Sequence, residues 1–469
     1  MYTEQICKYI DANRENILND IAALVNIPST KGAPEEKMPF GKYPAEALNK
    51  ALEMCRESGF AVKNISNAIG YADMNDLPLE LGIFAHMDVV PAGDGWESNP
   101  FEMIYKDGCI YGRGVSDDKG PAVAALYAMK AVKDVGIPLK KNVRLILGSD
   151  EECGSGDLPY YFASEKTPAF SFSPDAEFPL INTEKGRFAP KFSAKTDNEE
   201  KCLPRVIYFE SGKAVNAVPN SAVMKIVGIS KSDADKVIKA APSFPDINFN
   251  ISFENDILTV TSSGKAAHAS LPEEGANALT ALLAIVDNFK LCECKSTSLL
   301  KGLNRLFAHN DCYGVSCGIA QEDKISGKLT LSLDILHFDG ETMCGCFDSR
   351  TPLCSTYENT AEPIIKALCG IGFEINEMNM TPPHHVDPEL PFIKTLLSAY
   401  EKHTGKKGEC VAIGGGTYVH SIENGVAFGS IMPDVNTNMH GANEYMPFED
   451  IITAAKIYAE AIAIICSQT

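Results

Sequence analysis

The segment LGIFAHMDVVPAG, residues 81–93, decides the fold of the N-terminal part of the chain. Its apolar run from Leu81 to Ala85 ends in His86, and Asp88 follows two positions later, before a proline and a glycine close the segment. In a β-strand, residues i and i+2 face the same side, so His86 and Asp88 are expected to face one space where the strand ends. That arrangement suits a metal-binding imidazole whose orientation is fixed by a carboxylate.

The neighbouring segments predict an α/β domain with a mostly parallel sheet and flanking helices. Short apolar runs at residues 81–86, 143–149 and 170–174 are typical of buried strands. Residues 121–136 have helical spacing and lie between the first two runs, with Pro121 suited to the first helical turn. Alternation of strands and helices favours parallel pairing, and open sheets of this kind bind ligands at the carboxyl ends of their strands.

A change of pattern predicts that this domain is interrupted by an inserted one. After about residue 187 short alternating strands prevail, with few helices, which is typical of an α+β domain. The α/β pattern returns near residue 387. We therefore expect one discontinuous domain over residues 1–187 and 376–469 and an inserted domain over residues 188–375. The segments used are an N-terminal helix at 4–26, strands at 223–229, 247–254, 256–264 and 328–336, a helix at 275–289, and the elements 388–405, 426–432 and 447–465.

Composition limits the partners and the compartment. The 469 residues are 45% hydrophobic and 22% charged, as in ordinary globular proteins, and carry a net charge of −20. That charge opposes binding to nucleic acids and to anionic membranes. Fifteen scattered cysteines without paired spacing indicate free thiols in a reducing compartment. With no signal-like start and no long apolar run, we expect a soluble cytoplasmic protein.

Polar residues at the predicted strand ends suggest a metal site. Two histidines with several carboxylates suit zinc or manganese, and a two-metal site needs one bridging carboxylate and another that accepts the proton of a water. Taken singly, each acidic residue is more often a solvated surface group and each histidine a structural one. The candidate residues are His86, Asp88, Asp117, Asp118, Glu151, Glu152, Asp175 and His440.

Seven ordered motifs resemble a known family. They are AHMDVVPAGDGW (85–96), YGRGVSDDKGP (111–121), GSDEECGSGD (148–157), SPDAEFP (173–179), SSGKAAHASLPEEGANAL (262–279), GGGTY (414–418) and NMHGANEYM (438–446). This set resembles the dinuclear metallopeptidases that include carnosinases, acetylornithine deacetylase and succinyl-diaminopimelate desuccinylase, and most of all the bacterial dipeptidase V branch, the Xaa-His or β-Ala dipeptidases. The resemblance implies a zinc-peptidase-like catalytic domain with an inserted α+β lid domain.

The resemblance also implies roles for the candidate residues. It assigns His86 and Asp175 to one divalent ion and Glu152 and His440 to the other, with zinc expected and manganese or cobalt as alternatives. Asp117 would bridge the ions rather than Asp118, because the family spacing GRGxxD falls on the first aspartate. Asp88 would orient the His86 ring, and Glu151 would be the general base.

Further residues resemble the substrate contacts of the family. His268 resembles a lid histidine that stabilises the oxyanion, although a histidine at a strand-to-helix turn is the alternative. Asn216 and Arg350 match substrate-contacting positions, with Arg350 suited to a peptide carboxylate or else to a structural ion pair. The resemblance also implies that Gly415 and Gly416 lie near the carboxylate end of the substrate, where glycines let the backbone come close. No GK[ST] follows them, which disfavours a phosphate loop. His420 departs from the branch pattern and bears on substrate preference, while His384 and His385 have no assigned role.

These inferences predict hydrolysis of dipeptides or short peptides by a metal-activated water. The small peptide is the expected partner. The resemblance to the dipeptidase V branch, in which a long lid supplies its histidine within one chain, implies a monomer, with a dimer as the alternative. An N-acyl amino acid deacylase of the same family is the second hypothesis. A non-enzymatic, metal-dependent binding protein is the third, and the presence of all ligands and of Glu151 disfavours it.

Overall fold

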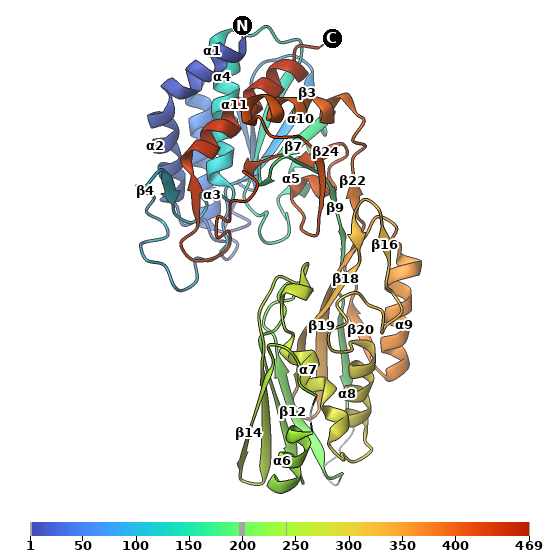
Figure 1. The fold of residues 1–469 in the computed structure, drawn as a ribbon. Helices are drawn as coiled ribbons and strands as arrows, with labels where there is room; N and C mark the ends of the chain where they lie inside the picture. The colour runs from blue at the N-terminus through green and yellow to red at the C-terminus, as the bar shows by residue number, and fades with distance from the viewer. Residues whose placement is uncertain (1, 197–201, 241, 469) are drawn as a thin grey trace. The chain divides into compact units, whose positions relative to one another are not determined.

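The computed structural model describes residues 2–196, 202–240 and 242–468, and it divides into two compact units (Figure 1). Unit 1 comprises Met1–Thr183, His385–Ala412 and Gly416–Thr469, and unit 2 comprises Glu184–His384 with Ile413–Gly415. The sequence predicts breaks after residues 187 and 375, and the structure divides the chain after residues 183 and 384. Unit 1 is therefore assembled from segments on both sides of unit 2.

Unit 1 is built on a mixed nine-stranded sheet. Its central strands pair in parallel, β6 with β3, β3 with β7 and β7 with β24, as the alternating sequence pattern predicts. The pairs toward the edges, β1 with β2, β2 with β6 and β24 with β9, are antiparallel. The parallel pairing thus holds for the centre of the sheet. In sheet order the strands are β1 (Ala61–Ile65), β2 (Ile69–Asp73), β6 (Asn142–Gly148), β3 (Leu79–His86), β7 (Phe170–Ser173), β24 (Gly425–Ala427), β9 (Leu180–Glu184) and β22 (His384–His385), with β23 (Cys410–Ile413) on β9.

The N-terminal segment forms two helices where the sequence predicts one. α1 (Tyr2–Ala12) and α2 (Arg14–Val25) are separated by Asn13, whose φ of −102° and ψ of 10° lie outside the helical region. The Asn13 side chain donates to the carbonyl oxygen of Tyr9 at 2.8 Å, a local bond that competes with helix continuation. Both helices pack on α4 (Lys119–Val135), beside it in Figure 1. The helical spacing of the apolar residues continues across the break, and for this reason the sequence predicts a single helix.

The long helices of unit 1 cover the sheet with an apolar core. α4 is buried along nearly its whole length and packs against α11 (Phe448–Ile465), which also contacts α10 (Pro391–Thr404). α3 (Lys42–Glu57) and the short α5 (Leu158–Phe162) complete the set of α-helices described in this unit. Among the described residues, no helix is both long and apolar enough to cross a bilayer.

Unit 2 is an α+β domain, as expected for the insert. Its ten-stranded sheet pairs antiparallel and carries helices α7, α8 and α9 around a separate apolar core. The helix predicted at 275–289 is shorter, because α7 gives way to a 3₁₀ turn at Val286–Asn288. In sheet order the strands are β14 (Asn248–Glu254), β15 (Ile257–Ser263), β13 (Ser221–Val227), β12 (Arg205–Ser211), β18 (Thr330–Phe338), β19 (Thr342–Thr351), β10 (Gly186–Phe188) and β21 (Met380–Thr381), with β11 (Lys191–Lys195) on β19 and β20 (Glu374–Glu377). The helices are α6 (Lys231–Lys239), α7 (Ala278–Ala284), α8 (Lys295–Leu306) and α9 (Glu362–Ile371).

The parallel strands of unit 1 bring three loops together. β3 ends at His86, β6 at Gly148 and β7 at Ser173, and His86 pairs in register with Gly148. Because parallel strands have their carboxyl ends at one edge of the sheet, the loops that follow begin side by side. These loops carry Asp88, the Glu151–Glu152 segment and Asp175.

Candidate metal centre

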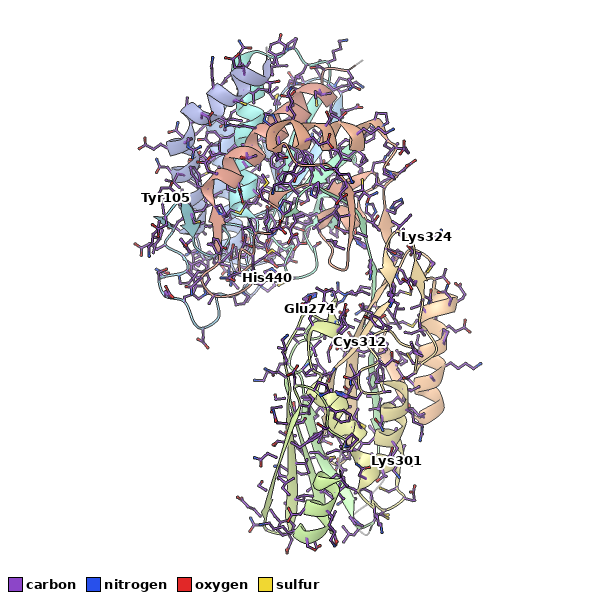
Figure 2. The ribbon with its side chains drawn as sticks, viewed as in Figure 1. Tyr105, Glu274, Lys301, Cys312, Lys324 and His440 are labelled. Carbon is purple, nitrogen blue, oxygen red and sulfur yellow. The ribbon has the colours of Figure 1, made fainter. Side chains whose placement is uncertain are left out.

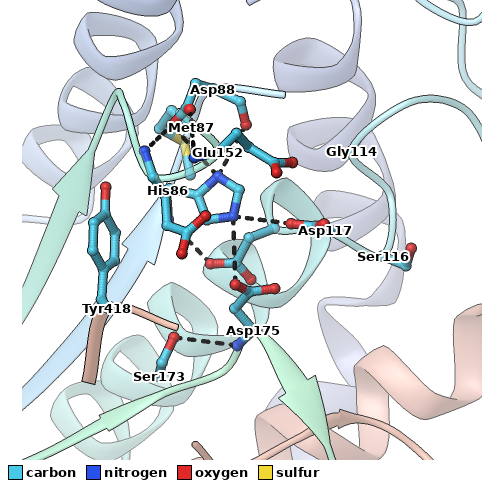
Figure 3. A network of polar contacts seen from close by, with 12 residues as sticks. His86, Met87, Asp88, Gly114, Ser116, Asp117, Glu152, Ser173, Asp175 and Tyr418 are labelled. Carbon is cyan, nitrogen blue, oxygen red and sulfur yellow. Dashed lines mark hydrogen bonds and ion pairs between the residues drawn. The ribbon is translucent and has the colours of Figure 1, made fainter. Parts of the chain in front are cut away.

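His86 is fully buried at the end of β3 and faces two carboxylates. Its Nδ1 lies 3.0 Å from the main-chain oxygen of Asp88. A carbonyl oxygen only accepts, so Nδ1 carries the proton and Nε2 presents a lone pair. Nε2 lies 2.9 Å from Asp117 Oδ1 and 3.6 Å from Asp175 Oδ2 (Figure 3), and it has no hydrogen-bond partner among the described residues. A neutral His86 ring therefore directs a lone pair at two carboxylates, and a cation held between the three groups would satisfy all of them, so the donors fit a metal ion.

Asp117 lies between the two histidines of the site. Its Oδ1 faces His86, and its Oδ2 lies 2.9 Å from His440 Nε2. The neighbouring Asp118 instead accepts from the backbone N–H of His86 at 3.1 Å and is fully buried. Asp117 is therefore the aspartate whose two oxygens face the two histidines, whereas Asp118 binds the backbone at the end of β3.

Glu152 and His440 form the other side of the cluster. Glu152 Oε2 lies 3.2 Å from His440 Nε2, so one imidazole nitrogen faces both Glu152 and Asp117. His440 sits on a loop with a left-handed φ of 63°, and its side chain is 53% exposed. Figure 2 shows it among the loop side chains at one end of unit 1. This side of the cluster is open to small molecules.

Two groups of donor atoms are compact enough to hold an ion. His86, Glu151 and Asp175 have donor atoms within 4.8 Å of one another, and so have His86, Asp117 and Glu152. Glu151 therefore lies beside His86 and Asp175, whereas Glu152 belongs to the group with His86 and Asp117. Neighbouring residues of one loop thus point into different parts of the site, as the sequence predicts for Glu151 and Glu152.

Asp88 acts on the site through its main chain and its side chain separately. The hydrogen bond to His86 Nδ1 comes from the Asp88 carbonyl, while its carboxylate Oδ1 is 3.5 Å from that nitrogen. The two carboxylate oxygens accept from the backbone N–H groups of Glu151 and Glu152, each at 3.2 Å. The sequence predicts a carboxylate that orients His86. The structure adds a second contact, to the loop that carries both glutamates.

Burial and mutual repulsion shift the pKa values of this cluster. Burial, with the Asp117 charge, raises the pKa of Glu152 to about 7, and burial raises the pKa of Glu151 well above its ordinary value. Burial also disfavours the Asp117 carboxylate, but its hydrogen bond with His440 and the adjacent imidazole of His86 outweigh burial and lower the pKa of Asp117. The hydrogen bonds with Asp117 and Glu152 raise the pKa of His440 to about 11. Protons here compensate buried negative charge, which divalent cations can do in their place.

Two histidines and several buried carboxylates that meet at one edge of a partly parallel sheet fit the class of metal-dependent α/β enzymes. The comparison with family models gives the particular family. The chain belongs to peptidase family M20/M25/M40, whose model matches residues 82–464. It is therefore a hydrolase that acts on peptide bonds, and the family resemblance of the seven motifs is confirmed.

Individual relatives agree with this assignment. The chain is 36% identical over 461 residues to the β-Ala-Xaa dipeptidase of Lactobacillus delbrueckii subsp. lactis, covering 96% of each chain. The solved structure of human carnosine dipeptidase 1 matches with a TM-score of 0.62 at 15% identity, covering 100% of this chain and 99% of that one. Aminoacylhistidine dipeptidase from Vibrio alginolyticus matches with a TM-score of 0.57 at 12% identity, covering 97% of each chain. The two structural matches show that the fold is shared.

In unit 2, the predicted substrate residues His268 and Asn216 are neighbours. Ala217 forms an isolated β-bridge with His268, and the Ala269 N–H donates to the Asn216 carbonyl at 2.9 Å. Both side chains are exposed. The Ser270 N–H donates to His268 Nδ1 at 3.2 Å, which leaves Nε2 as the protonated nitrogen of a neutral ring.

Arg350 is buried in unit 2 and firmly held. Its Nε donates to Asp348 Oδ1 at 2.6 Å and its Nη2 to Asp348 Oδ2 at 3.3 Å, while Nη1 donates to the Gly414 carbonyl at 2.6 Å. Arg350 is thus tied to the first residue of the GGGTY segment, beside Gly415 and Gly416. The bonds to Asp348 make Arg350 part of a structural ion pair. The bond to Gly414 places the arginine next to the glycine segment that the resemblance assigns to the same end of the substrate.

Several residues of the site were not predicted from the sequence. Tyr418 and Asp157 lie under the Glu151 loop, and Arg113 and Glu444 join the Asp117 and His440 loops. All four belong to the quoted motifs, but their partners are up to 331 positions apart in the chain, so no local pattern reveals the pairs. Of the histidines without a role, His385 contacts Thr183 Oγ1 through Nδ1 at 2.8 Å, and His420 lies in the 3₁₀ turn Tyr418–Ser421.

Proposed function

We propose that the chain is a dipeptidase that uses two divalent metal ions. His86 and Asp175 hold one ion, Glu152 and His440 hold the other, and Asp117 contributes to both. The observation that carries this proposal is the position of Asp117 between two imidazoles, with one carboxylate oxygen 2.9 Å from His86 Nε2 and the other 2.9 Å from His440 Nε2. Bound divalent ions would supply positive charge that acidifies water and polarises the scissile carbonyl.

Glu151 is the proposed general base. It lies beside His86 and Asp175, and its backbone N–H is held by Asp88, so its carboxylate has a defined position. Its raised pKa, which burial causes, matches a group that accepts a proton from water and later donates it to the leaving amine. Asp88 keeps the tautomer of His86 and the loop of Glu151 in place.

The proposed contacts to the peptide come from unit 2 and from the adjoining glycine Gly416 of unit 1. Arg350 binds the terminal carboxylate of the substrate, with Gly415 and Gly416 allowing close approach of the backbone. His268, which is protonated at Nε2, donates to the developing oxyanion, and Asn216 contacts the same end of the peptide. These roles make a free carboxylate a requirement for good substrates.

A substrate panel with reconstituted metals tests the proposal. Chelated protein is loaded with zinc, manganese or cobalt and assayed on free-amine dipeptides, with N-acetyl and N-succinyl amino acids as controls. We expect metal-dependent dipeptide hydrolysis, with the most active ion naming the metal. Activity on the N-acylated compounds alone would instead identify the deacylase. Glu151→Ala is expected to abolish turnover and keep its metal content, and normal hydrolysis by this variant would reject the mechanism.

The physiological setting completes the proposal. We infer that the enzyme works as a cytoplasmic monomer on small peptides, without a nucleic-acid or membrane partner. The net charge of −20 and the scattered cysteines support this inference. Light scattering of the metal-loaded protein measures the mass directly, and a dimer mass would correct the oligomeric state without affecting the chemistry.

A further inference from the structure

Glu444 is a buried carboxylate that the proposed reaction does not use. It has no exposed surface, and its two oxygens accept from the segment directly before Asp117. Oε1 accepts from the Ser116 N–H at 3.0 Å and from the Ser116 hydroxyl at 2.9 Å, and both oxygens lie 3.1 Å from the Gly114 N–H. Figure 3 shows Gly114 and Ser116 on the loop that leads into Asp117. The position of Asp117 therefore depends on a side chain located 327 residues further along the chain.

Arg113 completes a buried ion pair and extends it to a second loop. Its Nη1 donates to Glu444 Oε2 at 2.6 Å, and only 1% of the residue is exposed. Its Nη2 donates to the carbonyl of Gly441 at 3.0 Å, directly after His440. The guanidinium also lies over the ring of Trp96, 5.3 Å from the ring centroid. Arg113 thus holds the main chain beside His440 while Glu444 holds the main chain beside Asp117.

We propose that Arg113 and Glu444 are positioning residues that set the distance between Asp117 and His440. This inference rests on the proposed metal centre. The His440 side chain is half exposed on a loop, and its imidazole is the part that contacts Asp117. Burial of His440 therefore does little to fix its position relative to Asp117. The Arg113–Glu444 pair supplies that definition, because both loops are bonded to the same two buried side chains.

The chemistry of the pair supports positioning rather than simple stabilisation. A buried ion pair gains little over well-packed apolar residues of the same volume, so stability alone does not require one. Glu444 instead uses its lone pairs on backbone donors with fixed directions, which apolar side chains cannot replace. Contacts of this kind around metal ligands change metal affinity or activity by about 10–100-fold when they are removed.

The decisive variant is Glu444→Gln, compared with Asp73→Asn as a matched control. Asp73 forms a bidentate pair with Arg144 in the same unit, with both N–O distances 2.8 Å, but touches no residue of the centre. Zinc affinity of each purified protein is measured by competition with a chromogenic chelator, next to urea unfolding of the metal-free forms. We expect Glu444→Gln to weaken at least tenfold the affinity for the second zinc, the one proposed to be held by Glu152 and His440. The variant should also lower kcat with little change in KM. Asp73→Asn is expected to lower the urea midpoint and to leave both zinc affinities intact.

Equal zinc affinities in Glu444→Gln and the wild type, with only a lower urea midpoint, would overturn the proposal. If Glu444→Gln does not fold, Ser116→Ala decides, since it removes a single hydroxyl donor to Glu444 and is expected to weaken the second zinc site several-fold. Unchanged zinc binding by Ser116→Ala would then reject the positioning role. Failure of the wild type to hydrolyse dipeptides would refute the proposed function alone, because the zinc titration needs no substrate.

Discussion

Tyr418 lies edge-on to the imidazole of His86, with ring centroids 6.2 Å apart and planes inclined at 84°. The hydroxyl of this buried tyrosine donates to Asp157 Oδ2. The same oxygen accepts the backbone N–H groups of Ser149 and Asp150 at 2.7 and 3.0 Å. One side chain from the GGGTY segment therefore supports both His86, the proposed metal ligand at the end of β3, and the start of the Glu151 loop.

Tyr418→Phe is expected to damage this support without changing the shape of the core. The ring remains against His86, but Asp157 loses a donor while staying fully buried. Asp157 Oδ2 keeps the two backbone donors, so the cost is that of one hydrogen bond to a charged group, about 1.5–3 kcal/mol of unfolding free energy. We expect that loss in urea unfolding, together with a several-fold lower kcat. Tyr105→Phe, at a 53% exposed position of the same unit, is the control and should behave as the wild type. Equal stability of the two variants would contradict the role of the hydroxyl.

Metal removal is expected to destabilise the protein as well as to stop catalysis. Burial and the Asp117 charge raise the pKa values of Glu152 and Asp175, so the ions relieve an unfavourable cluster. At a free metal concentration of about 1,000 times Kd, an ion that binds only the folded state adds about 4 kcal/mol. The urea midpoint should therefore rise with free zinc in the wild type. In Asp117→Asn the rise should be smaller, and a wild-type midpoint independent of zinc would argue against a metal centre.

The sequence predicts the strands of the catalytic core well because they are buried on both faces. The run ending at His86, the run ending at Gly148 and the helix beginning near Pro121 all appear within a few residues of their predicted bounds. Continuous apolar runs leave little choice of structure. The antiparallel edges of the sheet were not predictable, since pairing direction depends on connections across the whole unit rather than on local pattern.

The site was predictable in residue type but not in its supports. His86 stands out because it ends an apolar strand, whereas Asp117 is distinguished from Asp118 only by the spacing of the family motif. Asp88 was expected to orient His86 through its carboxylate, yet the closest contact is its carbonyl oxygen, a choice that depends on the backbone direction after the strand. Glu444 and Tyr418 look like ordinary polar and aromatic residues in sequence, because burial and long-range partners alone give them their roles.

The pairing of α10 with α11 predicts a loss of stability in acid. Burial disfavours the Glu460 carboxylate, but the neighbouring polar groups of His403, Lys402 and Thr3 outweigh burial and lower its pKa to about 2. Lys402 Nζ donates to Glu460 Oε1 at 2.6 Å, and His403 Nε2 lies 3.8 Å from Oε2. Because the folded pKa is depressed, the stabilisation is present above the ordinary pKa of 4.5 and is lost as the pH falls from there toward 2. The contribution at neutral pH is about 1–3 kcal/mol.

Urea unfolding of Glu460→Gln at several pH values tests this prediction. The variant should be less stable than the wild type at pH 7, and the difference should shrink as the pH drops below about 4.5. Glu449→Gln, whose side chain is 71% exposed on the same helix, is the control and should differ little from the wild type. A difference that persists unchanged down to pH 3.5 would assign the effect of Glu460 to packing instead.

Arg350→Lys tests which end of the substrate the arginine binds. Lysine keeps the charge but cannot hold both Asp348 and the Gly414 carbonyl while facing a ligand, because it lacks the planar fork of guanidinium. If Arg350 binds the terminal carboxylate, losing a charged hydrogen bond of about 1.5–3 kcal/mol should raise KM for a dipeptide by about 10–100-fold. The corresponding dipeptide amide should already be a poor substrate of the wild type, and Arg350→Lys should add little to that loss.

Arg187→Lys is the control for Arg350→Lys, since Arg187 also donates to Asp348 but is 42% exposed. It should keep the preference for the free carboxylate, and equal losses on dipeptide and amide in Arg350→Lys would place the arginine elsewhere in the reaction.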